Sequence, residues 1–167
     1  MSSAPDLMQL LDFTPDDLQV NRAGKLSPRQ AARLMRIRRR STLVSAGIML
    51  LIGLAATLVM FLAQRDNSTI GLLVGITLTI INAIVMARAV QNWLRLADDL
   101  NGGTVETLSG GVQRTVRVIG RALIYVLKID QREVVVPKAV FNAVPEGARY
   151  RLFRAQRSGT LLAAEPV

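Results

Sequence analysis

The sequence contains no cysteine and no histidine. Without cysteine the chain forms no disulfide bond, and it offers no thiolate as a nucleophile or as a zinc ligand. Without histidine it lacks the side chain that titrates nearest to neutral pH and the commonest ligand of transition metals. We therefore expect no metal site and no cofactor.

Aromatic residues make up only 4% of the chain, although 50% of its residues are hydrophobic. Proteins that bind single-stranded nucleic acid stack bases on exposed aromatic side chains, so this scarcity argues against nucleic acid as a partner. A soluble domain usually spreads its apolar residues along the chain. Here many of them fall in two uncharged blocks, which is typical of a membrane protein.

The two uncharged blocks span residues 42–64 and 68–87. About 20 apolar residues in a helix cross the hydrocarbon core of a bilayer. Three residues separate the blocks, so the two helices must be adjacent and antiparallel. The alternative is a buried pair in a soluble bundle, but a soluble helix has a polar face and neither block has one. The pattern predicts a membrane α-helical hairpin with two transmembrane helices.

Basic residues are concentrated on one side of this hairpin, in a chain of net charge +9. Eight of them, with no acidic residue among them, precede the first block: Arg22, Lys25, Arg29, Arg33, Arg36, Arg38, Arg39 and Arg40. The loop between the blocks has one arginine and one aspartate. The positive-inside rule then predicts a protein of the plasma (inner) membrane, with both termini cytoplasmic and the 64–68 loop outside.

The basic segment has three interpretations: a topology signal alone, a binding surface for anionic lipid head groups, or a nucleic-acid surface. The last lacks the motif and the aromatic residues that it requires. Trp93 follows the second block at a position suited to an anchor at the membrane interface. The candidate residues for head-group contact or topology are Arg29, Arg33, Arg36, Arg38, Arg39, Arg40, Arg88 and Trp93.

Small residues recur every four positions in the second block. They are Gly71, Gly75, Thr79, Ala83 and Ala87. Small residues allow close approach of helix backbones in lipid, where packing rather than hydrophobicity drives association. The stripe has two interpretations, contact with the first helix of the same chain or contact with a protein partner or a second copy.

The flanking segments indicate how far the two helices extend. Ser27 and Gln30 form a capping box with proline at the first helical position, so we expect one helix from about Pro28 to Ala63. The second helix is expected to continue to about Leu100, where Asn101 and two glycines stop it. The chain is thus divided into N-terminal short helices and turns (1–26), the helical hairpin (27–100) and a C-terminal region (101–167).

The segment from Phe13 to Gln30 reads FTPDDLQVNRAGKLSPRQ. Its pattern DDLxxNRxGxLSxxQ resembles a segment of uncharacterised bacterial proteins with two membrane spans and a small C-terminal β domain. The resemblance extends to the order of the regions. It implies the same architecture and no known activity, so it assigns no functional residues.

After Gly103 the apolar residues alternate with period two, as in strands. Expected strands cover 104–108, 112–119, 122–129, 133–136, 150–155 and 160–164, with a break at Gly110–Gly111 and a helical turn over 137–144. So many short strands in about 65 residues predict a small all-β cytoplasmic domain, an SH3-like or OB-like barrel or roll. Its expected core is Val116, Val118, Leu123, Tyr125, Leu127, Ile129, Val134, Val136, Phe141, Tyr150 and Leu152.

No arrangement of residues indicates catalysis. Asp130 and Glu133 bracket an expected hairpin turn, where solvated acids are ordinary, and no phosphate-binding loop or serine with a base is present. We therefore expect a non-enzymatic accessory or scaffold subunit, whose hairpin packs on other membrane helices and whose β domain docks a partner. The alternative is recognition of anionic lipid, or less readily nucleic acid, by the basic segments.

Overall fold

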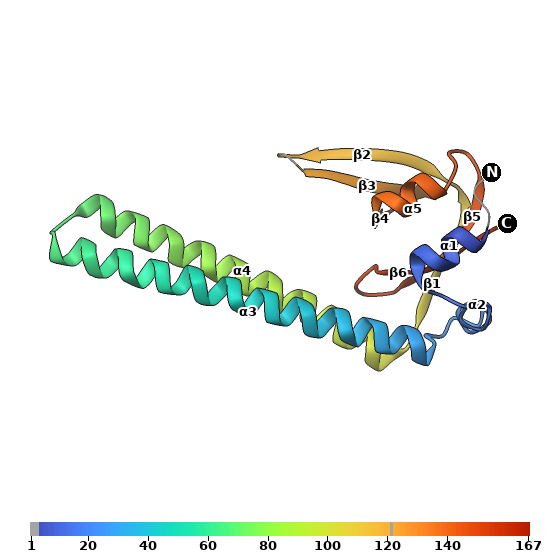
Figure 1. Cartoon of the computed structure of the whole chain (residues 1–167), viewed down its shortest axis with the longest axis horizontal. Helices are drawn as coiled ribbons and strands as arrows, with labels where there is room; N and C mark the ends of the chain where they lie inside the picture. Colours follow the sequence, from blue (N-terminus) through green and yellow to red (C-terminus); the bar gives the residue numbers. More distant parts are fainter. Residues whose placement is uncertain (1–3, 121) are drawn as a thin grey trace. The chain divides into compact units, whose positions relative to one another are not determined.

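The computed structural model describes residues 4–120 and 122–167 (Figure 1). Its helices are α1 (Ala4–Leu11), α2 (Pro15–Arg22), α3 (Pro28–Arg65), α4 (Thr69–Gly102) and α5 (Lys138–Ala143). Its strands are β1 (Val105–Gly111), β2 (Gln113–Ile119), β3 (Ala122–Ile129), β4 (Arg132–Val136), β5 (Arg149–Ala155) and β6 (Leu161–Pro166). Two compact units result: Leu34–Ala97, and the chain up to Arg33 together with Asp98–Val167.

The unit Leu34–Ala97 is an antiparallel pair of helices, formed by most of α3 and α4 (Figure 1). The more buried residues of each helix recur in steps of three or four, the spacing of a left-handed helix pair. On α3 they are Ser41, Ser45, Met49, Ile52, Ala56, Val59 and Ala63, and on α4 they are Gly71, Gly75, Leu78, Asn82, Val85 and Ala89. Most are small, which lets the two backbones lie close together.

Both long helices have the length and composition to cross a membrane. Only 11% of the apolar window of α3 and 6% of that of α4 are buried. The core helix of a soluble protein would bury most of such a window. The hairpin therefore leaves a broad apolar surface uncovered.

The start of α3 that the sequence predicted from its capping box is confirmed, and α2 begins at a capping box of the same kind. At α2, the Thr14 hydroxyl accepts from the Asp17 amide at 3.3 Å, and the Asp17 carboxylate accepts from the Thr14 amide at 2.9 Å. At α3, the Ser27 hydroxyl accepts from the Gln30 amide at 3.1 Å, and the Gln30 side chain accepts from the Ser27 amide at 3.3 Å. Each reciprocal pair satisfies two backbone N–H groups that the helix itself leaves free.

The β region consists of two antiparallel three-stranded sheets, in the orders β1-β5-β6 and β2-β3-β4. Within the described residues there is no closed barrel, so the expectation of an SH3-like or OB-like barrel was wrong in this respect. The chain passes from one sheet to the other at Val112, whose amide and carbonyl bond to Ala148 and Gly147. Among the described residues β2 pairs only with β3, so its other edge has no strand beside it (Figure 1).

The expected break at Gly110–Gly111 is also wrong. Both glycines lie in β1, where they pair with Tyr150 and Arg149 of β5. A Cβ atom on Gly110 would lie 3.1 Å from the Ile129 side chain of β3. The glycine thus marks a close approach between the two sheets and not a turn.

The core lies where the two sheets and α5 meet. Leu127, Ile129, Val134, Val136, Phe141, Tyr150 and Leu152 are buried as predicted, and Tyr125 is half-buried with its ring 5.1 Å from that of Phe141. Phe153, which the predicted core omitted, is fully buried. Three predicted core residues are instead exposed: Val116 by 46%, Val118 by 68% and Leu123 by 57%. They lie on the β2–β3 hairpin beyond the reach of the second sheet.

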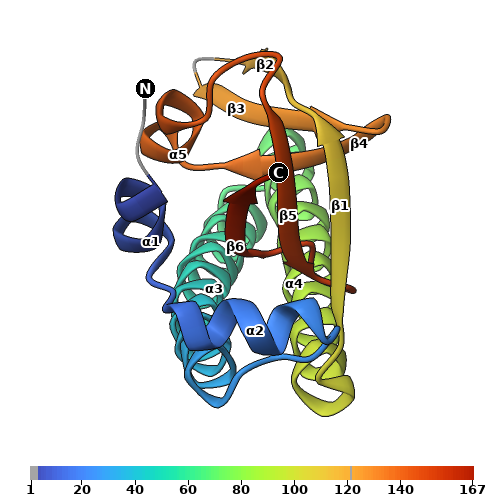
Figure 2. The ribbon, with the colours of Figure 1, turned by 90° about the vertical axis from the view of Figure 1, so that its right-hand side faces the viewer.

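The N-terminal helices complete this unit. α1 packs against β6 and α5, with Leu7 and Leu11 buried (Figure 2). Backbone bonds join the loop before α3 to the start of β1, from the Leu26 amide to the Gly103 carbonyl and from the Val105 amide to the Gly24 carbonyl. The short N-terminal helices therefore contribute to the core of the β region.

Candidate functional site

The stripe of small residues on α4 is divided by the structure into two parts. A Cβ atom on Gly71 would lie 2.6 Å from Cβ of Ala63, and one on Gly75 would lie 2.2 Å from Cγ of Met60. Both distances are shorter than any van der Waals contact. Gly71 and Gly75 are therefore glycines because α3 of the same chain passes over them.

The other three members, Thr79, Ala83 and Ala87, are exposed in the single chain. The reason is helical geometry: four residues turn an α-helix through about 400°, so a four-residue repeat moves about 40° around the helix at each step. The face that α3 covers instead follows Leu78, Asn82, Val85 and Ala89. The stripe leaves the contact with α3 after Gly75, and its second half faces outward.

Asn82 is the one amide inside the second apolar block. Its side-chain nitrogen lies 3.5 Å from the position of a Cβ atom on Gly53, so it faces α3 at a point where that helix has no side chain. Its Oδ1 atom has no hydrogen-bond partner among the described residues. The amide fills the space opposite Gly53 without an interhelical bond of its own.

The basic residues predicted for head-group contact or topology also fall into groups. Arg29 pairs with Asp12, and Arg33 donates to the Leu11 carbonyl, so both hold the N-terminal segment. Arg36, Arg39, Arg40 and Arg88 are exposed, and none of them forms an ion pair within the described ranges. These four remain available for an anionic surface.

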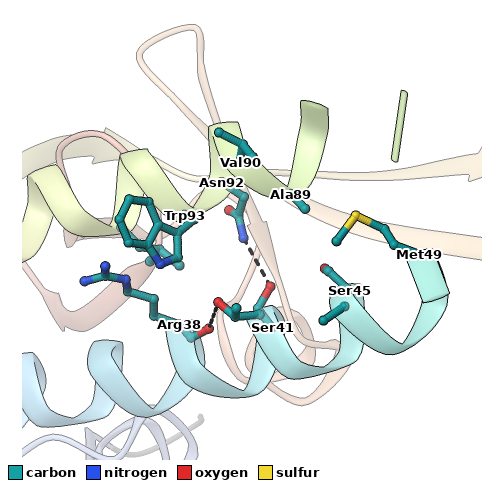
Figure 3. A pocket seen from close by; sticks show the side chains of 11 residues that line it. Arg38, Ser41, Ser45, Met49, Ala89, Val90, Asn92 and Trp93 are labelled. Atoms are coloured by element: carbon teal, nitrogen blue, oxygen red, sulfur yellow. Dashed lines mark hydrogen bonds between the residues drawn. The ribbon is translucent and has the colours of Figure 1, made fainter. Parts of the chain in front are cut away.

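Arg38 and Trp93 form a third arrangement, between α3 and α4 (Figure 3). The guanidinium carbon of Arg38 lies 4.2 Å from the Trp93 ring centroid, a cation–π contact. One turn further, the Asn92 amide donates to the Ser41 hydroxyl at 3.4 Å. These side chains line one end of a cavity of about 250 Å³ between the two helices.

The DDLxxNRxGxLSxxQ segment contributes a cluster of buried polar side chains that the sequence did not predict. Asp17, Asn21, Ser27 and Gln30 are each less than 5% exposed. Burial alone would raise the pKa of Asp17, but hydrogen bonds from Ser27 and Thr14 and the charge of Arg29 outweigh it and lower that pKa. The Asn21 amide has no partner in the described chain. These residues cap and join α2 and α3.

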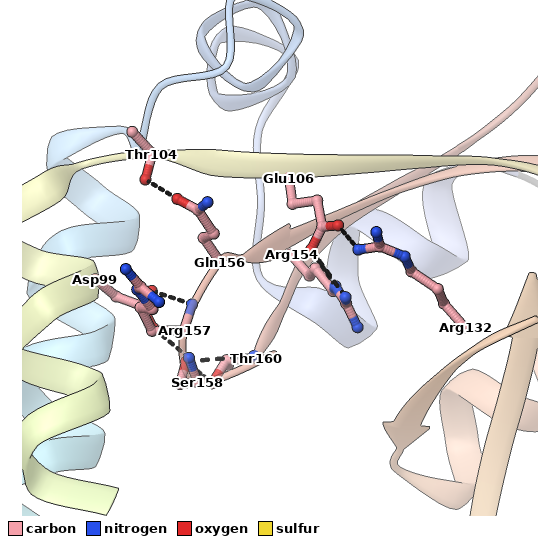
Figure 4. A network of polar contacts seen from close by, with 9 residues as sticks. All are labelled: Asp99, Thr104, Glu106, Arg132, Arg154, Gln156, Arg157, Ser158 and Thr160. Carbon is pink, nitrogen blue, oxygen red and sulfur yellow. Dashed lines mark hydrogen bonds and ion pairs between the residues drawn. The ribbon is translucent and has the colours of Figure 1, made fainter.

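Ion pairs connect the strands and helices of the β-containing unit, and Figure 4 shows those of Glu106. Glu106 of β1 accepts from Arg132 of β4 and from Arg154 of β5, so it joins the two sheets. Glu165 of β6 accepts from Arg22 of α2 and from Arg151 of β5. The hydrogen bond from Arg22 is the main reason that the pKa of Glu165 lies below its ordinary value.

The two carboxylates weighed as catalytic candidates occupy ordinary positions. Asp130 lies in the β3–β4 turn with a φ of 47°, and Glu133 pairs with Arg117 at 2.6 Å. In the part of the chain that the structure describes, no three carboxylates gather in a way that suits a metal ion.

No protein-family model matches the chain, and no curated protein is significantly similar to it.

Proposed function

We propose that the chain is a non-enzymatic subunit of an integral membrane assembly, whose α3–α4 hairpin packs on other membrane helices. The observation that carries this proposal is the uncovered apolar surface of the hairpin together with its outward small residues, Thr79, Ala83 and Ala87. An apolar surface of this extent favours lipid or another helix over water. The small side chains favour another helix over lipid as the partner of this surface, because they permit close contact between helix backbones.

A second surface supports docking of a protein by the β region. The β2–β3 hairpin exposes three apolar side chains on one face of the sheet by 46–68%: Val116, Val118 and Leu123. Soluble domains seldom leave such a patch open unless it binds something. The proposal places this domain at the cytoplasmic face, on the positive-inside argument.

The alternative function is recognition of anionic lipid by the basic segments. The observation that favours it is the exposure of Arg36, Arg39, Arg40 and Arg88 beside the apolar blocks. Each such residue contributes about 1 kcal/mol of attraction to an anionic leaflet. Nucleic acid is the weaker form of this alternative. Proteins that bind single strands stack bases on exposed aromatic side chains. In the described β region, aromatic residues such as Phe141 and Phe153 are buried.

The packing proposal is tested with Ala83→Leu and Ala87→Leu. A leucine at either site would hold a partner helix away, so the complex purified in mild detergent should shift to the size of a monomer. Ala55→Leu makes the same exchange at an exposed site on α3 and serves as the matched control. Size-exclusion chromatography with light scattering provides the measurement. A wild-type protein that is monomeric, or a complex that tolerates both leucines, would contradict the proposal.

A further inference from the structure

The cavity between α3 and α4 is apolar along most of its length and polar at one end. Its walls include Ala46, Met49, Ala89, Val90 and Leu96, and the small side chains among these leave the space open. Arg38 and Trp93 lie at one end, and Met49 lies toward the other (Figure 3). Such a cavity matches an amphiphile, with a charged group at the arginine and a hydrocarbon chain along the helices.

A second cavity adjoins the first at the same arginine. Its volume is about 370 Å³, and it shares Arg38, Thr42 and Trp93 with the first cavity. Met35 and Leu43 add apolar walls, and Arg39 adds a second guanidinium. The described residues that line the two cavities thus include two arginines and no carboxylate, which favours an anionic ligand.

The position along the helices identifies the source of that ligand. Arg38 precedes the first uncharged block by four residues, and Trp93 follows the second block by six. At 1.5 Å per residue these offsets are about 6 Å and 9 Å beyond the hydrocarbon core, which is the level of the phospholipid head groups. The apolar end, at Met49, lies inside the block that would be in contact with acyl chains.

We propose that a single anionic phospholipid occupies this site. Its phosphate pairs with Arg38 and Arg39, one acyl chain lies in the cavity between α3 and α4, and the other lies along Leu43. The proposal rests on the membrane insertion proposed above and not on the partner helix. It differs from a general attraction to an anionic leaflet, because that attraction involves Arg36 and Arg40 as much as Arg38.

The chain supplies its own reporter, because Trp93 is its only tryptophan. Full-length protein is reconstituted in phosphatidylcholine vesicles that contain a low mole fraction of brominated phosphatidylglycerol or, separately, of brominated phosphatidylcholine. Bromine quenches tryptophan fluorescence only at short range. A seated anionic lipid predicts stronger quenching by the brominated phosphatidylglycerol at equal mole fraction.

Three variants separate a seated lipid from a general charge effect. Arg38→Gln should lower the preference for phosphatidylglycerol about fivefold, the effect of losing one arginine contact at a membrane surface. Arg40→Gln removes the same charge from an exposed position that lines neither cavity and should leave the preference unchanged. Ser45→Leu keeps every charge but fills the cavity, and it should lower the preference as well.

Three outcomes would overturn the proposal. Equal quenching of the wild-type protein by the two brominated lipids would show that no anionic lipid is selected, while the oligomer test of Ala83→Leu would stand unaffected. An equal loss of the preference for phosphatidylglycerol in Arg38→Gln and Arg40→Gln would show that this preference is a general attraction of basic residues to anionic lipid. Absence of quenching by either lipid would overturn membrane insertion together with this site.

Discussion

Asp99 shows what single residues contribute to this molecule. Its carboxylate, 2% exposed, accepts hydrogen bonds from the Arg157 and Ser158 amides at 2.7 Å each (Figure 4). Those amides begin the β5–β6 turn, where no strand pairing satisfies them. Asp99 lies near the end of α4, so one side chain joins this turn to the last turns of that helix. The neighbouring Asp98 is exposed and has no such role.

Asp99→Ala should destabilise the β-containing unit by about 2 kcal/mol, because two backbone amides lose a charged acceptor. Hydrogen exchange at Arg157 and Ser158, followed by mass spectrometry of the protein in detergent, should become faster. Asp98→Ala is the matched control and should leave the exchange of both amides as it is. Equal acceleration in the two variants would show that the Asp99 hydrogen bonds contribute nothing to stability.

At the scale of the element, the tolerance of the α3–α4 pair to a larger residue depends on whether the side chain opposite each glycine can move. Opposite Gly71 lies Ala63, whose Cβ and Cα atoms would be 2.6 Å and 3.3 Å from an added methyl group. Opposite Gly75 lies Met60, and the closest atom is Cγ of its flexible side chain. Methionine can rotate away from a new methyl group, whereas an alanine fixed to its backbone cannot.

Gly71→Ala should therefore destabilise the helix pair more than Gly75→Ala does. Overpacking costs about 1–3 kcal/mol where the neighbour is rigid, and less where a side chain can move. Loss of helical circular dichroism on heating in detergent micelles measures the difference. A larger effect of Gly75→Ala, or no effect of either change, would mean that the two helices do not pack through these glycines.

At the scale of the whole molecule, the distribution of charge predicts orientation. The chain has no cysteine, so single-cysteine variants report accessibility without background. In intact cells, a membrane-impermeant maleimide should label Asp66→Cys, in the loop between α3 and α4, and should not label Glu146→Cys, in an exposed turn of the β region. Permeabilised cells should show labelling at both sites. The reverse pattern in intact cells would contradict the positive-inside argument.

Features that depend on local chemistry were predictable from the amino-acid sequence. Helices α2 and α3 begin at caps that short-range hydrogen bonding specifies, and α3 and α4 have the length and apolar composition that the uncharged blocks indicated. The six strands of the β region followed from period-two patterns, apart from the break wrongly expected at Gly110–Gly111. Membrane insertion, orientation and the resemblance to two-span bacterial proteins remain predictions.

Which surfaces are covered depends on how the elements pack, and local sequence patterns do not record this. A four-residue stripe looks uniform in the sequence, but its rotation around α4 separates Gly71 and Gly75, under α3, from the exposed Ala83 and Ala87. Alternating apolar residues on β2 predicted a core, yet Val118 has no sheet opposite it. Burial depends on which element lies opposite a residue. A sequence pattern predicts the face on which a side chain lies, but it does not predict whether another element covers that face.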